Sequence, residues 1–155
     1  MSESETLRPA APDDAAAVAA LTDAAYGKFV PRIGRSPMPM TFDYARVIAE
    51  HPVWVIDATN GPCAVLYLIP RDDHLMIESI AVHPEVQGRG MGRRLMALAA
   101  DEARRLGVPE IRLYTNVKMT ENITFYRRLG YEEVERRHKD GFDRVYMRLQ
   151  VAHRG

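Results

Sequence analysis

The spacing of apolar residues along the chain changes repeatedly, which predicts that strands alternate with helices. Short apolar runs rich in β-branched and aromatic residues predict strands at 6–9, 53–58, 63–69, 74–82, 110–115, 131–138 and 142–149. A spacing of three to four residues predicts helices at about 14–26, 41–51, 90–106 and 120–129. The apolar face of the third helix consists of Leu95, Leu98, Ala99, Ala103 and Leu106.

Turn and cap residues separate these elements. Asn60-Gly61 joins two β-rich runs and is a strong hairpin signal. Asp13 or Asp14 can cap the first helix and Thr41 the second. The segment 27–40 contains three prolines and two glycines, so no continuous helix is expected there. The order β-α-α-β-β-β-α-β-α-β-β predicts a mixed α/β sheet in one domain.

Composition narrows the classes of protein. The 155 residues are 46% hydrophobic and 27% charged, as is common in a soluble globular domain. A net charge of +0 gives no global attraction to nucleic acid, and no apolar run approaches the roughly 18 residues of a membrane span. The start, MSESETLRP, lacks the features of a signal peptide, and Cys63 is the single cysteine. We therefore expect a cytoplasmic protein with no nucleic-acid or membrane partner.

The stretch after strand 74–82 has the residues of an anion-binding turn. Gly88, Gly90 and Gly92 alternate with other residues just before a helix, and three arginines lie beside them. Glycines allow close approach of a ligand, and the amides that open a helix carry partial positive charge. A P-loop would require GK[ST] here, and a dinucleotide fold would require an acidic residue after the next strand. Neither is present. The five histidines form no ligand-spaced cluster, so no metal is expected.

Two motifs in the same order resemble those of the GNAT N-acetyltransferases. Gln87-x-x-Gly90-x-Gly92 after an apolar strand resembles the family's coenzyme A-binding motif, and Phe125-Tyr126-x-x-Leu129-Gly130-Tyr131 resembles its helix-to-strand signature. The resemblance implies a single GNAT domain over 5–150, with a mixed central sheet of about seven strands flanked by about four helices. It also implies acetyl-CoA as co-substrate, a small-molecule or peptide amine as acceptor, and a homodimer as one arrangement.

The same resemblance assigns roles to individual residues. The pantetheine arm would contact the main chain of Ile80, Ala81 and Val82. The pyrophosphate would lie against Gln87, Gly88, Arg89, Gly90, Met91, Gly92 and Arg93. Tyr126 would be the general acid, because a phenol with a pKa near 10 is protonated at neutral pH and can donate to a departing thiolate.

The chain also departs from the family pattern. Many members have asparagine where this chain has Met119, and often alanine where it has Asn122. Asn122 is expected to take over a polar contact to the cofactor, with Asn116 as the other candidate and a purely local bond as the alternative. Some members have a glutamate where this chain has Met76. Glu78 lies on the same face if the strand is regular, and is the candidate general base unless it pairs with an arginine or faces solvent.

The acceptor is the least determined part of the hypothesis. The loop 27–40 contains Arg32 and Arg35 beside stiffening prolines, which would suit an amine that also bears a carboxylate. We expect acetyl transfer to a primary amine by direct attack within a ternary complex, because Cys63 does not resemble an acyl-carrying nucleophile. The alternatives are another acyl-CoA, a protein amine, or a catalytically silent CoA-binding sensor or interaction module.

Overall fold

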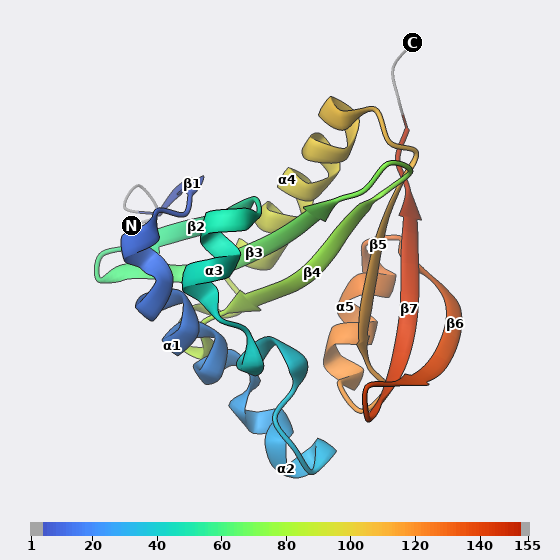
Figure 1. Ribbon diagram of the computed structural model, residues 1–155, viewed down its shortest axis with the longest axis horizontal. Helices are drawn as coiled ribbons and strands as arrows, with labels where there is room; N and C mark the ends of the chain where they lie inside the picture. The colour runs from blue at the N-terminus through green and yellow to red at the C-terminus, as the bar shows by residue number, and fades with distance from the viewer. Residues whose placement is uncertain (1–4, 153–155) are drawn as a thin grey trace.

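The computed structural model describes residues 5–152 and arranges their strands in one sheet (Figure 1). The strands are β1 (Thr6–Pro9), β2 (Val53–Ala58), β3 (Gly61–Pro70), β4 (Leu75–Val82), β5 (Glu110–Asn116), β6 (Glu132–Lys139) and β7 (Phe142–Gln150). Their order across the sheet is β1-β2-β3-β4-β5-β7-β6. Only β4 and β5 pair in parallel among these strands. The predicted mixed sheet of seven strands is confirmed.

Helices cover both faces of the sheet (Figure 1). On one face lie α1 (Ala15–Tyr26), the single turn α2 (Val30–Ile33) and α3 (Tyr44–Glu50), and on the other lie α4 (Met91–Leu106) and α5 (Thr120–Arg128). Two clusters of buried apolar side chains fill the space between sheet and helices, one beneath α4 and α5 and one beneath α1 and α3. Within residues 5–152, four helices exceed one turn, as the sequence predicts.

The register of β4 changes at Glu78. On the β3 side, Tyr67 pairs with Ser79 and Leu68 with Ile77, which leaves Glu78 as the extra residue of a β-bulge. Before the bulge, Ile77 belongs to the cluster beneath α4, and after it Ile80 packs against that same cluster. The side-chain alternation therefore shifts by one residue, so the regular strand on which the Glu78 prediction depended is absent.

Three local predictions about helix caps and the apolar face of α4 differ from the structure. Thr41 ends a 3₁₀ turn, and Asp43 instead caps α3 by accepting a 3.4 Å bond from the Arg46 amide. The side chain of Asp14 makes no forward cap bond to α1. Leu106, predicted on the apolar face of α4, is 38% exposed. The segment 27–40 is broken into short helical turns, as its prolines predicted.

Two further sequence predictions concern membrane-spanning helices and the N-terminal segment. No helix within residues 5–152 combines the length and apolar character needed to cross a membrane. The first four residues of the N-terminal segment lie outside the described residues.

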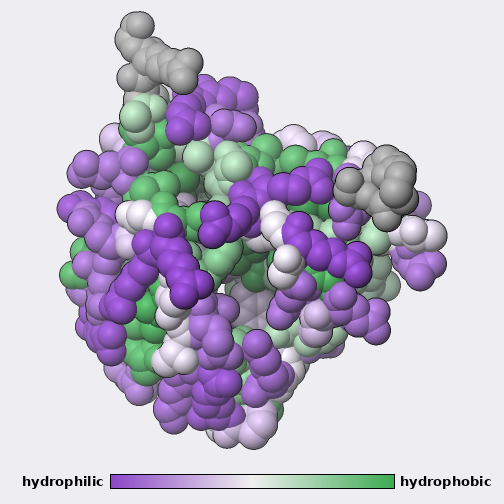
Figure 2. Space-filling view, turned by 180° about the vertical axis from the view of Figure 1, so that it is seen from behind, coloured by the Kyte–Doolittle hydropathy of each residue, from purple (hydrophilic) through white to green (hydrophobic). Residues whose placement is uncertain are grey.

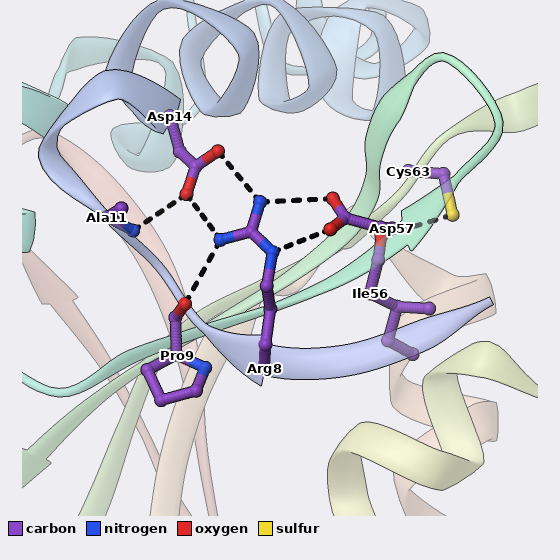
Figure 3. Close-up of polar contacts among 7 residues, drawn as sticks. All are labelled: Arg8, Pro9, Ala11, Asp14, Ile56, Asp57 and Cys63. Carbon is purple, nitrogen blue, oxygen red and sulfur yellow. Dashed lines mark hydrogen bonds and ion pairs between the residues drawn. The ribbon is translucent and has the colours of Figure 1, made fainter. Parts of the chain in front are cut away.

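A guanidinium on β1 connects three elements (Figure 3). Arg8 lies between two carboxylates: it donates to Asp57 on β2 at 2.6 and 3.1 Å, and to Asp14 before α1 at 2.8 and 2.9 Å. Asp14 also accepts the Ala11 amide at 2.7 Å, which explains why it does not cap α1. The bond from Arg8 lowers the pKa of the Asp14 carboxyl. The start of α1 is thus tied to the edge of the sheet.

We expect Arg8→Met to lower the free energy of unfolding by about 1.5–3 kcal/mol at pH 7, the range for hydrogen bonds to charged groups. Because the folded-state pKa of Asp14 lies below its unfolded value, its contribution is present above the unfolded pKa and is lost as pH falls through the folded pKa. The difference between variant and parent should therefore shrink from about pH 4 downward.

Urea denaturation of both proteins at pH 7, 4 and 3 measures this difference. The control is Arg46→Met, which removes an exposed i,i+4 pair with Glu50 and should change stability by less than about 0.5 kcal/mol. Equal effects of the two substitutions, or a difference that does not change with pH, would contradict the structural role given to Arg8.

Candidate functional site

A groove lies at the open end of β4, between α4 and α5. It holds about 1320 Å³ of empty space, counted out to the solvent. Figure 2 views the molecule from the side of these helices and shows a hollow near its centre with hydrophilic residues around the rim. The predicted cofactor residues that line the groove are Ile80, Ala81, Val82, Gln87, Gly88, Gly90, Met91, Gly92, Arg93 and Asn122. Arg89 is not among the lining residues.

The end of β4 has a free backbone edge. β4 and β5 pair only from Leu75–Ile111 to Ile77–Leu113 and then diverge (Figure 1). Beyond this point the Ile80 carbonyl accepts a 2.7 Å bond from the Tyr26 hydroxyl, so it points away from β3. A residue's N–H and C=O lie on the same edge of a strand, so the Ile80 amide also faces the divergence. Within residues 5–152 no strand pairs with this edge, so it suits the amides of a pantetheine arm.

The glycines of the turn have two different roles. Gly88 and Gly90 have φ of 85° and 83°, in the left-handed region that other residues seldom adopt. A Cβ at either position would meet no atom within 4 Å and would project into open space. Gly92 is different, because a Cβ there would lie 3.2 Å from Cζ of Phe125. Gly88 and Gly90 keep the turn open, whereas Gly92 allows α4 and α5 to pack closely.

Positive charge is concentrated beside this turn. Arg89, Arg93 and Arg94 are exposed, and within residues 5–152 none of them has an ion pair or a side-chain hydrogen bond. The first amides of the 16-residue helix α4 add the positive end of its dipole. A groove with an open glycine turn and unpaired cations fits a pyrophosphate, so the residues present match the group that the resemblance implies.

Tyr126 lies where the groove meets a second pocket. Its side chain is 5% exposed, lines both spaces, and packs against the rings of Phe125 and Tyr131 at centroid distances of 5.5 and 6.0 Å. Burial raises the pKa of the Tyr126 phenol, which keeps the hydroxyl protonated at neutral pH. Within residues 5–152 this hydroxyl has no hydrogen-bond partner. It is therefore available to donate to a ligand.

The second pocket lies between the diverging strands β4 and β5 and holds about 520 Å³ of empty space. Its polar lining consists of Glu78, Ser79, Tyr114, Thr115, Asn116 and Arg144. Pro37, Met38, Pro39 and Phe142 contribute apolar walls. The pocket shares Tyr26, Ile80 and Tyr126 with the groove, so the two spaces meet at Tyr126.

Glu78 reaches this pocket despite the bulge. Its Oε1 accepts a 2.7 Å hydrogen bond from the hydroxyl of Tyr114 on β5. The side chain is half-buried and forms no ion pair with an arginine in the described part of the chain. Glu78 thus neither pairs with an arginine nor simply faces solvent. Its carboxylate lines the pocket that Tyr126 also lines.

The two asparagines lie in different spaces. Asn122 lines the groove one turn before Tyr126, and its Nδ2 contacts the Met119 sulfur at 3.6 Å. Asn116 lines the pocket, and its Oδ1 accepts a 2.9 Å bond from the Lys118 amide. Asn122 is therefore the one placed to meet a ligand in the groove.

The two loop arginines do not line the pocket, contrary to the sequence hypothesis. Arg32 donates to Glu121 at 2.6 Å and to the Lys118 carbonyl at 3.1 Å, and it lowers the pKa of Glu121 to about 2. Arg35 stacks on the ring of Phe142 at 4.2 Å. Both guanidinium groups are occupied by contacts within the protein.

Sequence reasoning missed the arginine that does line the pocket, Arg144 on β7. Its signal was its spacing, because Phe142, Arg144 and Tyr146 alternate along a strand and share one face. An arginine in phase with two aromatic residues is expected to be drawn into the interior. The residue that connects it to Glu78, Tyr114, had no signal beyond its place in a strand.

A family model for the acetyltransferase (GNAT) domain matches residues 49–133, which include β4, the glycine turn and α5. The chain belongs to this family. The mixed sheet of seven strands, its flanking helices and the order of both motifs along the chain agree with what the resemblance implied. Within residues 5–152 no group of three or more His, Cys, Asp or Glu side chains is arranged to hold a metal ion.

Individual relatives match over different lengths. The chain is 26% identical over 109 residues to a peptidyl-lysine N-acetyltransferase, YjaB, of Escherichia coli, which covers 70% of this chain and 68% of that protein. It is 37% identical over 57 residues to an aminoalkylphosphonate N-acetyltransferase of Salmonella typhimurium, covering 37% of each. The chain thus spans 37% of the length of the aminoalkylphosphonate N-acetyltransferase, and it spans 26% and 16% of two other curated relatives.

Solved structures extend the likeness to nearly the whole chain. The structure of yncA from Salmonella typhimurium with its cofactor acetyl-CoA matches with a TM-score of 0.71 and 24% identity. The match covers 97% of this chain and 96% of that one. At this identity the comparison shows the shared fold.

We expect Gly90→Val to weaken acetyl-CoA binding by roughly tenfold or more, because a β-branched side chain would occupy the space where the pyrophosphate approaches. Calorimetric titration of the folded variant measures the change. The matched control is Gly107→Val: Gly107 also has a left-handed φ, of 73°, and open space around its Cβ, but it ends α4 far along the chain from the turn. Both substitutions impose similar backbone strain.

If the affinity of Gly90→Val for acetyl-CoA equals that of Gly107→Val, the turn is not the pyrophosphate site. Thermal melts of both variants, compared before titration, show whether the strain is indeed matched.

Proposed function

We propose that the protein transfers an acetyl group from acetyl-CoA to a primary amine by direct attack while both substrates are bound. One observation supports this most strongly. A cofactor-sized groove and a smaller polar pocket meet at one buried tyrosine, Tyr126. Such a junction is where a thioester from one side and an amine from the other would come together.

In this proposal the groove residues bind the coenzyme. The free edge of β4 pairs with the pantetheine arm through the main-chain groups of Ile80 and Val82. Ala81, between them, lines the groove, but its main-chain groups face β3. The turn from Gln87 through Gly92 cradles the pyrophosphate, and Arg93, which lines the groove, adds a charge-assisted contact. Asn122 offers its side-chain amide to the coenzyme from the first turn of α5. Arg89 lies outside the lining and contributes long-range charge.

Acetyl transfer requires the removal and the delivery of protons. Glu78 accepts a proton from the ammonium form of the acceptor, directly or through water, so that the nitrogen can attack. The new C–N bond forms at the acetyl carbonyl carbon as the C–S bond breaks and its electron pair leaves with sulfur. Tyr126 donates its hydroxyl proton to that sulfur, and the remaining proton from the attacking nitrogen is returned to the phenolate through solvent. The products are an amide, free CoA and one proton.

Direct transfer is favoured over an acyl-enzyme by the state of the single cysteine. Cys63 is buried, its sulfur contacts the Ile56 carbonyl and the Met91 sulfur at 3.4 Å each, and burial raises the pKa of its thiol. A buried thiol that stays protonated is a weak nucleophile. Two relatives also support an amine acceptor, since one is a peptidyl-lysine N-acetyltransferase and the other an aminoalkylphosphonate N-acetyltransferase.

The setting of the enzyme belongs to the same proposal. A single GNAT domain over 5–150 is supported by the continuous sheet from β1 to β7. A cytoplasmic location and the absence of a nucleic-acid partner are supported by the sequence alone. If a homodimer forms, the edge strand β6 is a poor interface, because its exposed Glu and Arg side chains discourage edge-to-edge pairing.

The first test is Tyr126→Phe, which keeps the ring and removes the hydroxyl. We expect kcat to fall by roughly 10²-fold or more at neutral pH with nearly unchanged acetyl-CoA affinity, because the departing thiolate loses its proton donor. Release of free CoA with a panel of amines gives kcat, and calorimetry gives the affinity. The control is Tyr131→Phe, which removes a buried hydroxyl that has no partner and lies next to the same ring.

A parental kcat in Tyr126→Phe, with chemistry shown to be rate-limiting, would mean that Tyr126 only packs between its neighbours and donates no proton. A parent that binds acetyl-CoA but acetylates no amine would favour the sensor alternative. Glu78→Gln in the same assay tests the general base. The variant should be slow at neutral pH, and its rate should rise as pH approaches the pKa of the amine, because the amine then loses its proton to solvent.

A further inference from the structure

The pocket between β4 and β5 is lined by a buried arginine whose guanidinium has no hydrogen-bond acceptor within residues 5–152. Arg144 is 6% exposed and lines the pocket. Its ion-pair partner is the exposed carboxylate of Asp140 at 3.6 Å, too long for a hydrogen bond. Its guanidinium carbon lies 4.1 Å from the centre of the Tyr114 ring. Within residues 5–152 its side chain makes no hydrogen bond.

This arrangement is costly unless something completes it. Burying a charge is unfavourable without a partner and hydrogen bonds, and a guanidinium has five N–H donors. Arg148, on the same strand, shows the ordinary outcome: its side chain is half-buried and pairs with Glu132 at 2.7 Å. Arg144 instead lines the pocket with its N–H donors free of hydrogen bonds within residues 5–152, and a carboxylate or phosphonate bound there could accept two of them.

We propose that Arg144 binds an anionic group of the acceptor, so that the physiological acceptor is an amine that also carries a carboxylate or phosphonate. This inference rests on the proposed function, because it names the substrate class of the same site. It places the anion at Arg144 on β7 and the amine at Glu78 on β4, next to Tyr126.

The opposite charges of the pocket match such a substrate. Glu78 and Arg144 both line it, yet they form no ion pair with each other. Tyr114 lies between them: its hydroxyl donates to Glu78 at 2.7 Å while its ring faces the guanidinium. The pocket therefore holds a negative and a positive group apart, the complement of an ammonium and an oxyanion in one small molecule. Phe142 and Met38 supply apolar surface for its carbon chain.

The first experiment uses the parent protein, acetyl-CoA and matched acceptors. Each amino acid is compared with its own carboxamide, and each ω-amino carboxylate with the aminoalkylphosphonate of the same chain length, by release of free CoA. We expect kcat/KM to be roughly ten- to hundredfold higher for the acid than for the neutral amide, as for a lost hydrogen bond to a charged group. The phosphonate series tells which oxyanion fits better.

The second experiment changes the protein. Arg144→Gln should raise the acceptor KM by roughly ten- to hundredfold, leave the acetyl-CoA KM unchanged, and remove the preference for the acid over the amide. Arg144→Lys should keep part of that preference, because the charge remains but the bidentate geometry is lost. The matched control is Arg148→Gln on the same strand, which should leave both KM values and the preference at parental levels. Thermal melts establish whether each variant is folded. If Arg144→Gln does not fold, the matched acceptors and the Arg144→Lys variant test the proposal instead.

Two results would overturn the inference while the proposed function stands: equal acetylation of acids and amides by the parent, or a preference for acids that survives in Arg144→Gln. A parent that binds acetyl-CoA yet acetylates none of the amines would overturn the proposed function and this inference with it.

Discussion

The parallel pairing of β4 and β5 ends after three residues, and the whole site depends on this early divergence. Had the two strands stayed paired to their ends, the amides of Ile80 and Val82 would bond to β5 and no edge would be free. The same divergence opens the pocket that holds Glu78 and Arg144. One interruption of the sheet thus leaves a free backbone edge, where we propose that the coenzyme binds, and opens the polar pocket beside it.

Packing on both sides of the sheet holds the strands apart. Tyr26, at the end of α1, is buried and donates its hydroxyl to the Ile80 carbonyl, so the helix supports the free edge from one face. On the other face α4 begins with buried Met91, and the ring of Phe125 occupies the space where a Cβ of residue 92 would lie. The position of α1 depends in turn on Arg8, which joins the start of that helix to β1 and β2. The shape of the proposed coenzyme groove therefore depends on contacts that lie far from Tyr126 and Glu78.

What could be predicted from the sequence is what short segments determine by themselves. The glycine turn, the helix after it and Tyr126 have local signatures, and the structure brings all three to one groove. The same is true of the strand boundaries, because hydrophobic periodicity and turn residues act within a few positions. These features identified the family and its coenzyme before any contact was known.

The remaining features arise from pairing between distant segments. The bulge at Glu78 is a property of its register with β3, which no pattern within β4 reveals. Arg32 was assigned to the acceptor site, but its partner Glu121 lies 89 residues away in sequence. Arg144 was overlooked because a charged residue in a strand is usually exposed, and only the meeting of β5 and β7 buries it beneath Tyr114. The proposed acceptor contacts thus arise from pairing between distant strands, and the alternation of Phe142, Arg144 and Tyr146 gave only a weak local signal for them.

We propose above all that the free edge of β4 binds acetyl-CoA through its main chain. Amide hydrogen exchange with and without acetyl-CoA measures this directly, residue by residue. We expect the Ile80 and Val82 amides to become strongly protected when the coenzyme binds. The Ile77 amide, which lies where β4 is already paired with β5, should change little by comparison. If acetyl-CoA binds and the exchange of Ile80 and Val82 is unaltered, the divergence of β4 and β5 does not form the coenzyme site.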